Sequence, residues 1–495
     1  MSVKHQDTYF LDAKTALKVA LQANEVDTSS ENVKGLQVCY YEAEQPLKDA
    51  PQNCIFVPLD NVYNYFVTTK NRFPNEINFD NTQFSQDERE LLNTSIHQIL
   101  YKSRVERAEL IDILMKQVKE LKPDFKEEKL RVFIPACRET TVIKNISENI
   151  AKTFEKKGYD VCFFIQDNAM QGCVDILPYI HTLHEFNPHI IVNINHFNNE
   201  YLNDEVFNFV WFQDSMPIVV NDEPIHLRKR DYMFALIPGI QSALRLKGIK
   251  CDIQNFCIST DVYKINKNIQ KKQKVVFIGG SYLENYNPYI NEVGGQAIDS
   301  FDDTNAQLVL KEMINHYRTN GEFTHQYLGE LANKFKKSKH YVQNYLFSYL
   351  IRDVTILELC KMEQEYEIEI YGWGWEKYPE LQKYYKGALS YGEAISNVYN
   401  SADYAIVAHP DYIIQQRTLE AAASGCTPLV YDCRYSHVVN PPYFEESVVY
   451  FKNLEDLKHI LNQKKQERDL NALVKQFSYE KFIQNMKTIV QKALK

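Results

Sequence analysis

Two charged side chains, Arg417 and Glu420, lie at the start of a short predicted helix in the stretch IIQQRTLEAAASGCTPLVYD. Its alanine run favours a helix, and Gly425 is typical of the left-handed residue just beyond a helix end. The free N–H groups of a helix N-terminus favour phosphate, and Arg417 can add a bidentate contact. Glu420 can accept hydrogen bonds from two neighbouring hydroxyls, as on a ribose. The pattern indicates a nucleoside diphosphate site; the alternative is an exposed i,i+3 ion pair of little energetic value.

Three further side chains follow predicted strands and could act in proton transfer. His196 closes VNINH, Asp214 closes VWFQD, and Glu139 lies in the loop after LRVFIPA. A carboxylate within hydrogen-bond reach of an acceptor hydroxyl can serve as a general base, so Asp214 and Glu139 are both candidates. For each of the three residues the alternative is a capping or loop-stabilising role.

The elements that must position these residues alternate between strands and helices in two successive regions. Residues 128–268 and 272–478 each show this rhythm, which predicts a parallel sheet with helices on both faces. We therefore predict an α/β chain with two doubly wound, Rossmann-like domains facing a cleft. Ligands bind such sheets at the carboxyl ends of their strands. Residues 479–495 are predicted to form a closing amphipathic helix.

The first 127 residues are predicted to form an α/β extension of unknown role that contains one long helix. Ser85 and Glu88 have the spacing of a capping box at its start, and apolar residues then recur at helical spacing to Leu121. The favoured interpretation is that this helix, residues 85–121, packs on its own domain. The alternative is a contact between copies of the chain in a homo-oligomer.

Composition excludes several classes of protein. The chain has 495 residues, 44% hydrophobic and 24% charged, which is ordinary for a globular protein of two or three domains. Its net charge of −9 argues against broad nucleic-acid binding. Ten scattered cysteines without a CxxC pair fit reduced thiols rather than a disulfide framework or a zinc site. With no signal-peptide core and no apolar span long enough for a membrane, a cytoplasmic location is expected.

Four segments between residues 274 and 432 resemble a known family. They are KVVFIGG, YGWGW, KGALSYGEAISNVYNSADYAIV and RTLEAAASGCTPLVYD, in that order. They resemble the nucleotide-sugar domain of GT-B glycosyltransferases, and more narrowly the group 1 transferases related to the CgeB proteins. Residues 130–265 resemble the matching N-terminal domain more weakly, through NPHIIVNINH and VWFQDSMP.

The resemblance implies transfer of a sugar from a nucleotide-sugar donor to a glycan or to a protein such as flagellin. It implies that Glu420 holds the ribose, that Arg417 and the helix end hold the diphosphate, and that His196 contacts the sugar. Close backbone approach to the phosphates would explain Gly279 and Gly280, although a plain turn is the alternative. The implied donor-binding set, including the residues that would frame the base, is Gly279, Gly280, Tyr371, Gly372, Trp373, Ser390, Tyr391, His409, Gln415, Gln416, Arg417, Thr418 and Glu420.

One departure from the family pattern affects the expected mechanism. Many related retaining transferases carry a second glutamate seven residues before the one that matches Glu420, and here that residue is Ile413. The sugar contact is missing or comes from Gln415, Gln416 or His409, so the stereochemical outcome stays open. The chain has no DxD motif and no histidine grouping that suggests a metal site. We therefore expect no metal cofactor, with the helix dipole and basic side chains stabilising the leaving diphosphate.

Two other functions are compatible with the same pattern. A nucleotide-sugar epimerase or hydrolase would use the same two-domain arrangement. A catalytically inactive domain serving as a binding scaffold is the third possibility, and the missing second glutamate keeps it open.

Overall fold

A computed structural model describes the chain from residue 85 onward, except residues 138–140, 167–175, 223, 284–288, 291–296 and 437–441. Before residue 85 it describes only five short strands, β1 (Asp7–Phe10), β2 (Leu17–Ala20), β3 (Cys39–Tyr40), β4 (Ile55–Phe56) and β5 (Asn78–Phe79). Most of the predicted N-terminal extension, and the candidate base Glu139, lie outside the described residues. The predicted long helix is confirmed as α2 (Gln86–Glu120).

Internal contacts divide the chain into two compact units. Unit 1 comprises Met1–Gln254 and Met486–Lys495, and unit 2 comprises Asn255–Asn485. The division falls earlier than the predicted boundary at residues 268–272. The segment after Gln254 belongs to unit 2 because the Ile258 N–H donates to the Phe477 carbonyl (2.8 Å), and the Tyr479 N–H donates to the Ile258 carbonyl (3.3 Å).

Unit 1 contains a six-stranded sheet whose strands all run parallel, in the order β11-β10-β9-β8-β6-β7. The order shows that the chain winds first to one side of β6 and then to the other. The elements are β6 (Arg131–Cys137), α3 (Thr141–Lys156), β7 (Asp160–Gln166), α4 (Ile176–Phe186), β8 (Ile190–Ile194), β9 (Phe207–Phe212), α5 (Pro217–Val220), β10 (Asp231–Ala235), α6 (Pro238–Leu246) and β11 (Cys251–Ile253).

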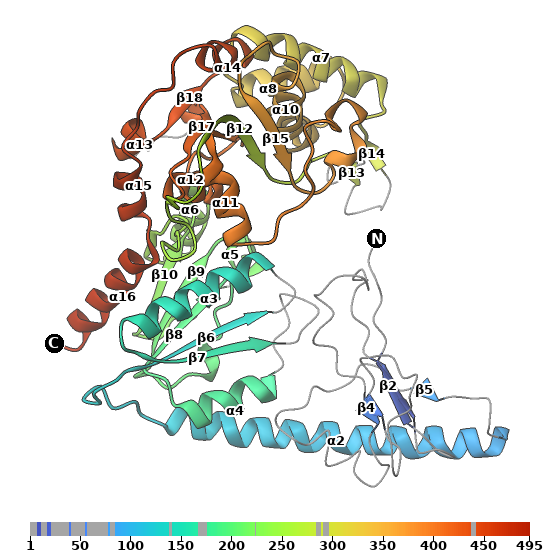
Figure 1. The fold of residues 1–495 in the computed structure, drawn as a ribbon. Helices are drawn as coiled ribbons and strands as arrows, with labels where there is room; N and C mark the ends of the chain where they lie inside the picture. The colour runs from blue at the N-terminus through green and yellow to red at the C-terminus, as the bar shows by residue number, and fades with distance from the viewer. Residues whose placement is uncertain are drawn as a thin grey trace. The chain divides into compact units, whose positions relative to one another are not determined.

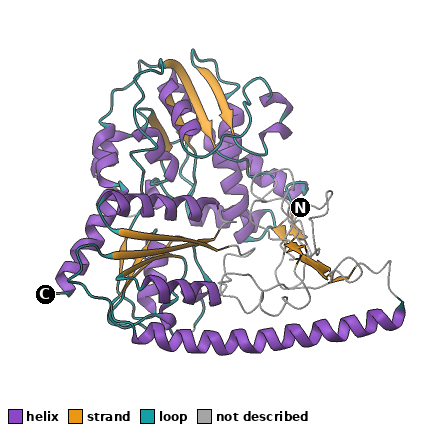
Figure 2. Cartoon of the chain, turned by 60° about the horizontal axis from the view of Figure 1, so that its bottom comes forward, coloured by secondary structure: helices purple, strands orange, loops and turns teal. Residues whose placement is uncertain are grey.

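Helices cover both faces of this sheet. Figures 1 and 2 show α3 on one face of β6 and β7, with α4 and the C-terminal half of α2 on the other. Leu114 and Val118 of α2 are buried with Leu177 and Leu183 of α4 in one hydrophobic cluster. The C-terminal part of α2 therefore packs on its own unit, as the favoured interpretation predicted. A role of this helix in oligomerisation stays a prediction.

Unit 2 contains a five-stranded parallel sheet in the order β15-β12-β16-β17-β18. A hydrophobic cluster surrounds it and includes Val275 and Phe277 of β12. Its strands are β12 (Lys272–Ile278), β15 (Glu367–Tyr371), β16 (Ala402–Val407), β17 (Thr427–Tyr431) and β18 (Val449–Phe451), beside the separate pair β13 (Tyr289–Ile290) and β14 (Ala297–Asp299). Its α-helices are α7 (Thr304–Thr319), α8 (His325–Lys334), α9 (Phe347–Tyr349), α10 (Thr355–Leu359), α11 (Glu393–Ser401), α12 (Gln416–Ala423), α13 (Pro442–Ser447), α14 (Leu454–Leu461) and α15 (Leu470–Gln476). The closing helix α16 (Tyr479–Ala493) begins in unit 2 and ends in unit 1.

The alanine-rich helix α12 behaves as its sequence predicts. Ala421, Ala422 and Ala423 are buried, because small side chains let the helix approach its neighbours closely. Gly425 follows with φ +77°, the left-handed conformation expected just beyond a helix end.

The two parallel sheets with their helices confirm the two predicted Rossmann-like units, whereas the cleft between them stays a prediction.

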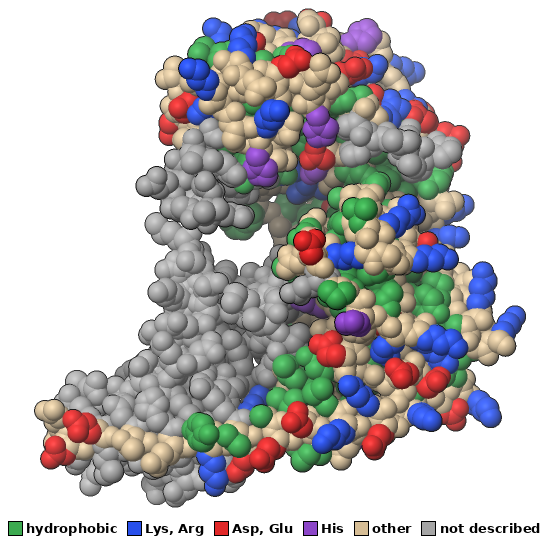
Figure 3. Space-filling model, turned by 180° about the vertical axis from the view of Figure 1, so that it is seen from behind, with side chains coloured by type: hydrophobic (Ala, Val, Ile, Leu, Met, Phe, Trp, Pro, Cys, Tyr) green, Lys and Arg blue, Asp and Glu red, His purple; other side chains and the backbone are tan. Residues whose placement is uncertain are grey.

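Charges are mixed on one face of the molecule. On the face drawn in Figure 3, acidic and basic side chains are interspersed rather than gathered by sign. Among the helices that the structure describes, none is long and apolar enough to cross a membrane.

The first testable consequence concerns Gly372, where β15 ends. Its φ is +131°, and an added Cβ would lie 2.2 Å from the carbonyl oxygen of Gly279. Gly372→Ala should therefore lower the free energy of unfolding of unit 2 by more than about 3 kcal/mol. Gly387→Ala is the matched control: its φ is +90° but nothing lies within 4 Å of the added atom, so only about 1 kcal/mol of backbone strain is expected. Equal losses of stability in urea would contradict the close contact.

Candidate functional site

The predicted donor-binding residues lie near the carboxyl edge of the unit 2 sheet. In the strand order, winding changes direction between β12 and β16. Open α/β sheets bind ligands outside the strand ends at such a switch point. Gly279 and Gly280 follow β12, His409 follows β16, and Arg417 lies in the first turn of α12, between β16 and β17. The topology therefore brings these residues to one edge of one sheet.

The first turn of α12 has backbone donors available. Its N-cap residue Gln415 does not cap the helix with its side chain, which donates instead to a carbonyl of the preceding loop (3.0 Å). The N–H groups of Gln416 and Arg417 have no intrahelical acceptor, and the helix end carries a partial positive charge. This end can accept an anion. Thr418, by contrast, uses its hydroxyl to donate to the carbonyl of Ile413 (3.2 Å), which is a local structural bond.

The guanidinium of Arg417 lies against the backbone at the end of β12. A Cβ built on Gly279 would be 3.0 Å from both Cζ and Nη2 of Arg417. At Gly280 the nearest atom to an added Cβ is the carbonyl oxygen of Trp373, at an ordinary 3.5 Å. The absence of a side chain at position 279 thus leaves room for the Arg417 guanidinium in this position, a reason that the sequence did not reveal.

The loops after β12 and β15 are locked together by backbone hydrogen bonds. The Gly279 N–H donates to the Tyr371 carbonyl, and the Ser281 N–H donates to the Trp373 carbonyl, both at 2.8 Å. The buried indole of Trp375 donates from Nε1 to the Gly279 carbonyl at 2.6 Å. Trp373 itself is 76% exposed. A fixed loop therefore presents an exposed aromatic ring next to the strand ends.

The other residues predicted to frame a base differ in what their side chains do. The hydroxyl of Tyr371 donates to Glu369 (2.9 Å), so it is engaged within the sheet. Ser390 and Tyr391 are exposed, just before α11. The Tyr391 ring lies edge-on to the buried ring of Tyr263, with their centroids 6.1 Å apart. Ser390 and Tyr391 are therefore exposed to solvent, whereas the Tyr371 hydroxyl is engaged within the sheet.

Arg352 is a second cation near this edge that the sequence analysis missed. It lies in a π-helical turn, Leu350–Val354, and is only 5% exposed. Its Nη1 donates to the Gly280 carbonyl (3.3 Å), and its guanidinium lies 3.6 Å from the ring centroid of Tyr282. Isolated π-helical turns are rare and often occur at functional sites. Arg352 therefore joins Arg417 beside the loop that follows β12.

The neighbouring Asp353 ties this turn to the same loop. Its carboxylate accepts hydrogen bonds from Ser281 Oγ (2.5 Å), the Tyr282 N–H (3.0 Å) and the Tyr378 hydroxyl (2.8 Å). Burial raises the pKa of Asp353, and these hydrogen bonds together with Arg352 oppose that rise. An adjacent arginine and aspartate inside an apolar helical stretch was the sequence signal that could have indicated both residues, because buried charges are rare without partners.

His409 is held in its neutral form. Burial, then Arg352 and Arg417, lower the pKa of His409 to about 3. Its Nδ1 accepts a hydrogen bond from the Asp411 N–H (3.4 Å), which places the proton on Nε2. The imidazole is thus an uncharged donor at neutral pH. Its pKa also shows that both arginines are close enough to act on it electrostatically.

Glu420 lies in an unusual environment for a carboxylate. It is 5% exposed, and burial raises its pKa to about 7, although Arg417, Tyr263 and Gln416 oppose this. The Gln416 Oε1 is buried without a hydrogen-bond partner among the described residues, while the Gln416 amide donates to the Cys257 carbonyl (3.3 Å). Buried polar atoms without partners are costly. This cluster therefore has unused hydrogen-bonding capacity beside an acidic group.

In unit 1 the structure brings together two of the three residues predicted for proton transfer. His196 and Asp214 follow β8 and β9, which are neighbours in the sheet. Asn195 connects these strand ends, because its Nδ2 donates to Asp214 Oδ2 (2.6 Å). Asp214 is exposed and His196 is half-buried. The third residue, Glu139, lies in the undescribed stretch after β6.

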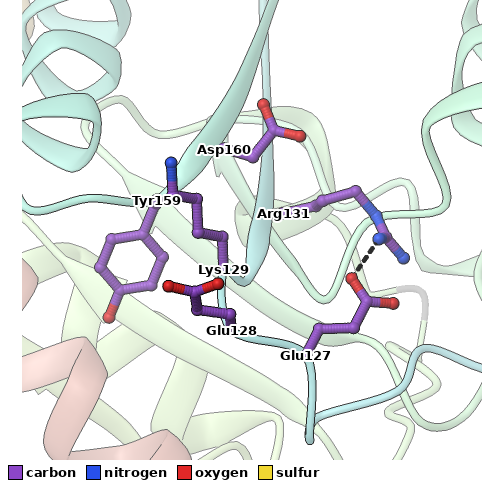
Figure 4. A pocket seen from close by; sticks show the side chains of 6 residues that line it. All are labelled: Glu127, Glu128, Lys129, Arg131, Tyr159 and Asp160. Atoms are coloured by element: carbon purple, nitrogen blue, oxygen red, sulfur yellow. Dashed lines mark hydrogen bonds and ion pairs between the residues drawn. The ribbon is translucent and has the colours of Figure 1, made fainter.

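Two other places where a functional centre could lie are a metal site and a polar pocket of unit 1. Within the described part of the chain, no group of three or more His, Cys, Asp or Glu side chains could hold a metal ion. Figure 4 shows a polar pocket where an Arg131–Glu127 ion pair lies beside the amino ends of β6 and β7. Ligands of parallel sheets bind at the opposite edge. The pocket is lined by Glu127, Glu128, Lys129, Arg131, Tyr159 and Asp160.

Several solved structures have a similar arrangement at low identity. The galactosyltransferase WaaB of the lipopolysaccharide outer core is 13% identical with a TM-score of 0.40, covering 73% of this chain and 99% of WaaB. HepE from Anabaena, solved with UDP and glucose, is 10% identical with a TM-score of 0.41, covering 73% and 100%. UDP-GlcNAc 2-epimerase from Methanocaldococcus jannaschii is 12% identical with a TM-score of 0.34, covering 72% and 100%. Likenesses of this size assign no activity.

Comparison with a protein-family model is more specific for the C-terminal part of the chain. Residues 352–488 match the family described as glycosyl transferase-like. The matched range contains α11, α12 and β15–β18, and thus Arg417, Glu420 and His409, and it begins at Arg352. A comparison with curated protein sequences finds no match. Residues 352–488 are therefore similar to a glycosyl transferase-like domain.

Proposed function

We propose that the protein is a glycosyltransferase that takes its sugar from a nucleoside-diphosphate donor bound at the carboxyl edge of the unit 2 sheet. The observation that carries the proposal is the pairing of Arg352 and Arg417 with the uncapped N-terminus of α12 at the switch point. Two arginines and a helix end provide charge and directed donors for a diphosphate. The glycosyl transferase-like match over the same residues supports this assignment.

Glu420 is proposed to hold the ribose. Its carboxylate would accept hydrogen bonds from ribose hydroxyls, and the Gln416 Oε1, which is buried without a hydrogen-bond partner among the described residues, would gain one in the same cluster. Trp373 and Tyr391, both exposed, offer ring faces on which a base could stack.

The donor sugar is proposed to be contacted by His409. Ile413, which stands where related retaining enzymes carry a second glutamate, is buried and apolar, and Gln415 donates to its own loop. His409 is held neutral with its proton on Nε2, so it can donate to a sugar hydroxyl without adding charge. The sequence left Gln415, Gln416 and His409 open as the residue that contacts the sugar. Of these, His409 has the most suitable donor, its Nε2–H group.

The reaction proposed is a displacement at the anomeric carbon. Asp214 accepts the proton of the acceptor hydroxyl while that oxygen bonds to the anomeric carbon and the bond to the diphosphate breaks. Arg352, Arg417 and the α12 N-terminus stabilise the charge of the leaving diphosphate, so no metal ion is required. His196 is proposed to contact the sugar. A glycan or a protein such as flagellin is the proposed acceptor, and kinship with the CgeB proteins stays a prediction.

The first prediction tests donor binding. UDP, GDP, dTDP, ADP and CMP are added separately, and thermal unfolding is followed for the wild type, Glu420→Gln and the exposed-surface control Glu393→Gln. One nucleotide at about a hundred times its dissociation constant should stabilise the wild type and Glu393→Gln by roughly 2.7 kcal/mol, with a much smaller effect on Glu420→Gln. EDTA should not change the shift.

The outcomes separate the competing functions. If no nucleotide stabilises the wild type, with or without magnesium, donor binding is refuted and a binding scaffold becomes the better explanation. A magnesium requirement would refute metal independence. With the matching nucleotide sugar, a new glycoside indicates transfer, whereas an isomerised or freed sugar indicates an epimerase or a hydrolase.

The second prediction concerns pH. Because burial raises the pKa of Glu420 to about 7, the unliganded protein gains stability from this group at low pH and loses it as pH rises through about 7. Ribose hydroxyls would donate to the ionised carboxylate, so nucleotide affinity should rise about tenfold between about pH 6 and pH 8. Calorimetry on Glu420→Gln, which cannot ionise there, corrects for titration of the nucleotide phosphates. Parallel pH profiles for both proteins would contradict the role of Glu420.

The third prediction uses the contact between Gly279 and Arg417. Gly279→Ala places a methyl group 3.0 Å from the guanidinium, which must move, so nucleoside diphosphate affinity should fall about tenfold. Gly280→Ala is the matched control, because its added methyl makes only an ordinary contact at 3.5 Å and should change affinity less than about twofold. An equal effect of both substitutions would show that Arg417 does not bind the diphosphate.

A further inference from the structure

Asn195 makes an unusual set of hydrogen bonds at the end of β8. Its side-chain Oδ1 accepts from the backbone N–H groups of Gln213 (2.7 Å) and Asp214 (3.2 Å). Its Nδ2 donates to Asp214 Oδ2 at 2.6 Å. One amide therefore holds both the turn after β9 and the carboxylate that this turn carries.

The backbone of Asn195 is shaped for this contact. Its φ is +62°, a left-handed conformation that asparagine tolerates better than most residues, and the side chain is 1% exposed. A buried asparagine whose oxygen accepts two hydrogen bonds has little freedom to rotate. By contrast, the Asp214 residue that it holds is exposed, and its Oδ1 has no hydrogen bond to any described residue. One oxygen is fixed while the other is available to a substrate.

The corresponding strand end of unit 2 provides an internal comparison. Both sheets share the order 2-1-3-4-5 in their strands, and an aspartate follows the fourth strand of each: Asp214 after β9 and Asp432 after β17. Asp432 is neutralised by Arg434, which donates from Nε (2.7 Å) and Nη2 (2.8 Å). Asp214 is held by a neutral amide instead. An arginine pairs a carboxylate with a positive charge, whereas an amide orients the carboxylate without adding a charge.

We propose that Asn195 is a positioning residue for Asp214, orienting this carboxylate so that its Oδ1 accepts the proton of the acceptor hydroxyl. The inference rests on the proposed transfer reaction and adds a residue that neither the motifs nor the family resemblance indicates. Asn195 touches no reacting atom; it acts by fixing Oδ2 and the backbone on either side. A general base that is misplaced loses a large part of its catalytic contribution.

Two substitutions separate the amide from the backbone conformation. Asn195→Gly keeps a residue that tolerates φ +62° but removes the clamp. Asn195→Asp keeps the size and places a second carboxylate oxygen next to Asp214 Oδ2, so the pair should share a proton and titrate at a higher pH. Asn187→Gly is the matched control, because Asn187 is also left-handed (φ +44°) but lies at the amino edge of the same sheet, before β8.

The kinetic test uses a nucleotide sugar that carries the nucleotide found to stabilise the wild type. It measures release of the nucleoside diphosphate across a range of pH. Asn195→Gly should lower kcat about tenfold or more with little change in the KM for the donor, whose proposed site lies in unit 2. Asn195→Asp should move the acidic limb of the pH profile upward by about one pH unit or more. Asn187→Gly should change neither. Unchanged kcat and pH profiles in both Asn195 variants would overturn the inference while leaving the transfer function intact.

A second measurement does not need turnover. A water-soluble carbodiimide couples glycine ethyl ester to protonated carboxyl groups, and mass spectrometry of the peptide containing Asp214 reports its labelling against pH. Labelling of Asp214 should persist about one pH unit higher in Asn195→Asp than in the wild type or Asn187→Gly. Identical labelling curves would overturn the coupling of Asn195 to Asp214, even if the wild type shows no transfer with any donor and the proposed function itself fails.

Discussion

The candidate donor site depends on the contact between the backbones of two loops, those after β12 and β15. Gly372 approaches Gly279 so closely that no side chain fits between them, and hydrogen bonds from Gly279, Ser281 and Trp375 hold this approach. Since the first loop is fixed, the guanidinium of Arg417 can lie directly on its backbone. Rigid, pre-positioned donors are what a diphosphate site requires, because they need not reorganise when charge develops.

Electrostatics in this region follow from that packing. Two arginines near one loop repel each other where little water screens their charges. The negative charge of Asp353 offsets that of Arg352, and its carboxylate accepts hydrogen bonds from Ser281 and Tyr282 of the same loop. His409 responds by staying neutral. Arg417 opposes the rise in the pKa of Glu420, but burial dominates. The result is a pair of arginines beside a carboxylate that ionises near neutral pH. This arrangement would complement a diphosphate next to the hydroxyl groups of a ribose.

The sequence predicted well what local patterns determine. Alternating strands and helices indicated both parallel sheets, and the alanine run before Gly425 indicated α12, because helix propensity and a left-handed C-terminal residue act over a few neighbours. Arg352 and Asn195 were missed, because their partners are distant in sequence: Gly280 for the first and Asp214 for the second. The unit boundary was misplaced for the same reason, since only long-range hydrogen bonds assign the segment after Gln254 to unit 2.

The two sheets also share one topology but differ in the partners of the polar side chains at their strand ends. In each sheet a histidine follows the third strand, His196 after β8 and His409 after β16, and an aspartate follows the fourth. In unit 2 the arginines keep the histidine neutral and Arg434 neutralises the aspartate, so that edge suits an anionic ligand. In unit 1 the amide of Asn195 holds Asp214, and no cationic side chain among the described residues forms an ion pair with this carboxylate. Equivalent strand ends are thus distinguished by the partner of each polar side chain as well as by the residue type.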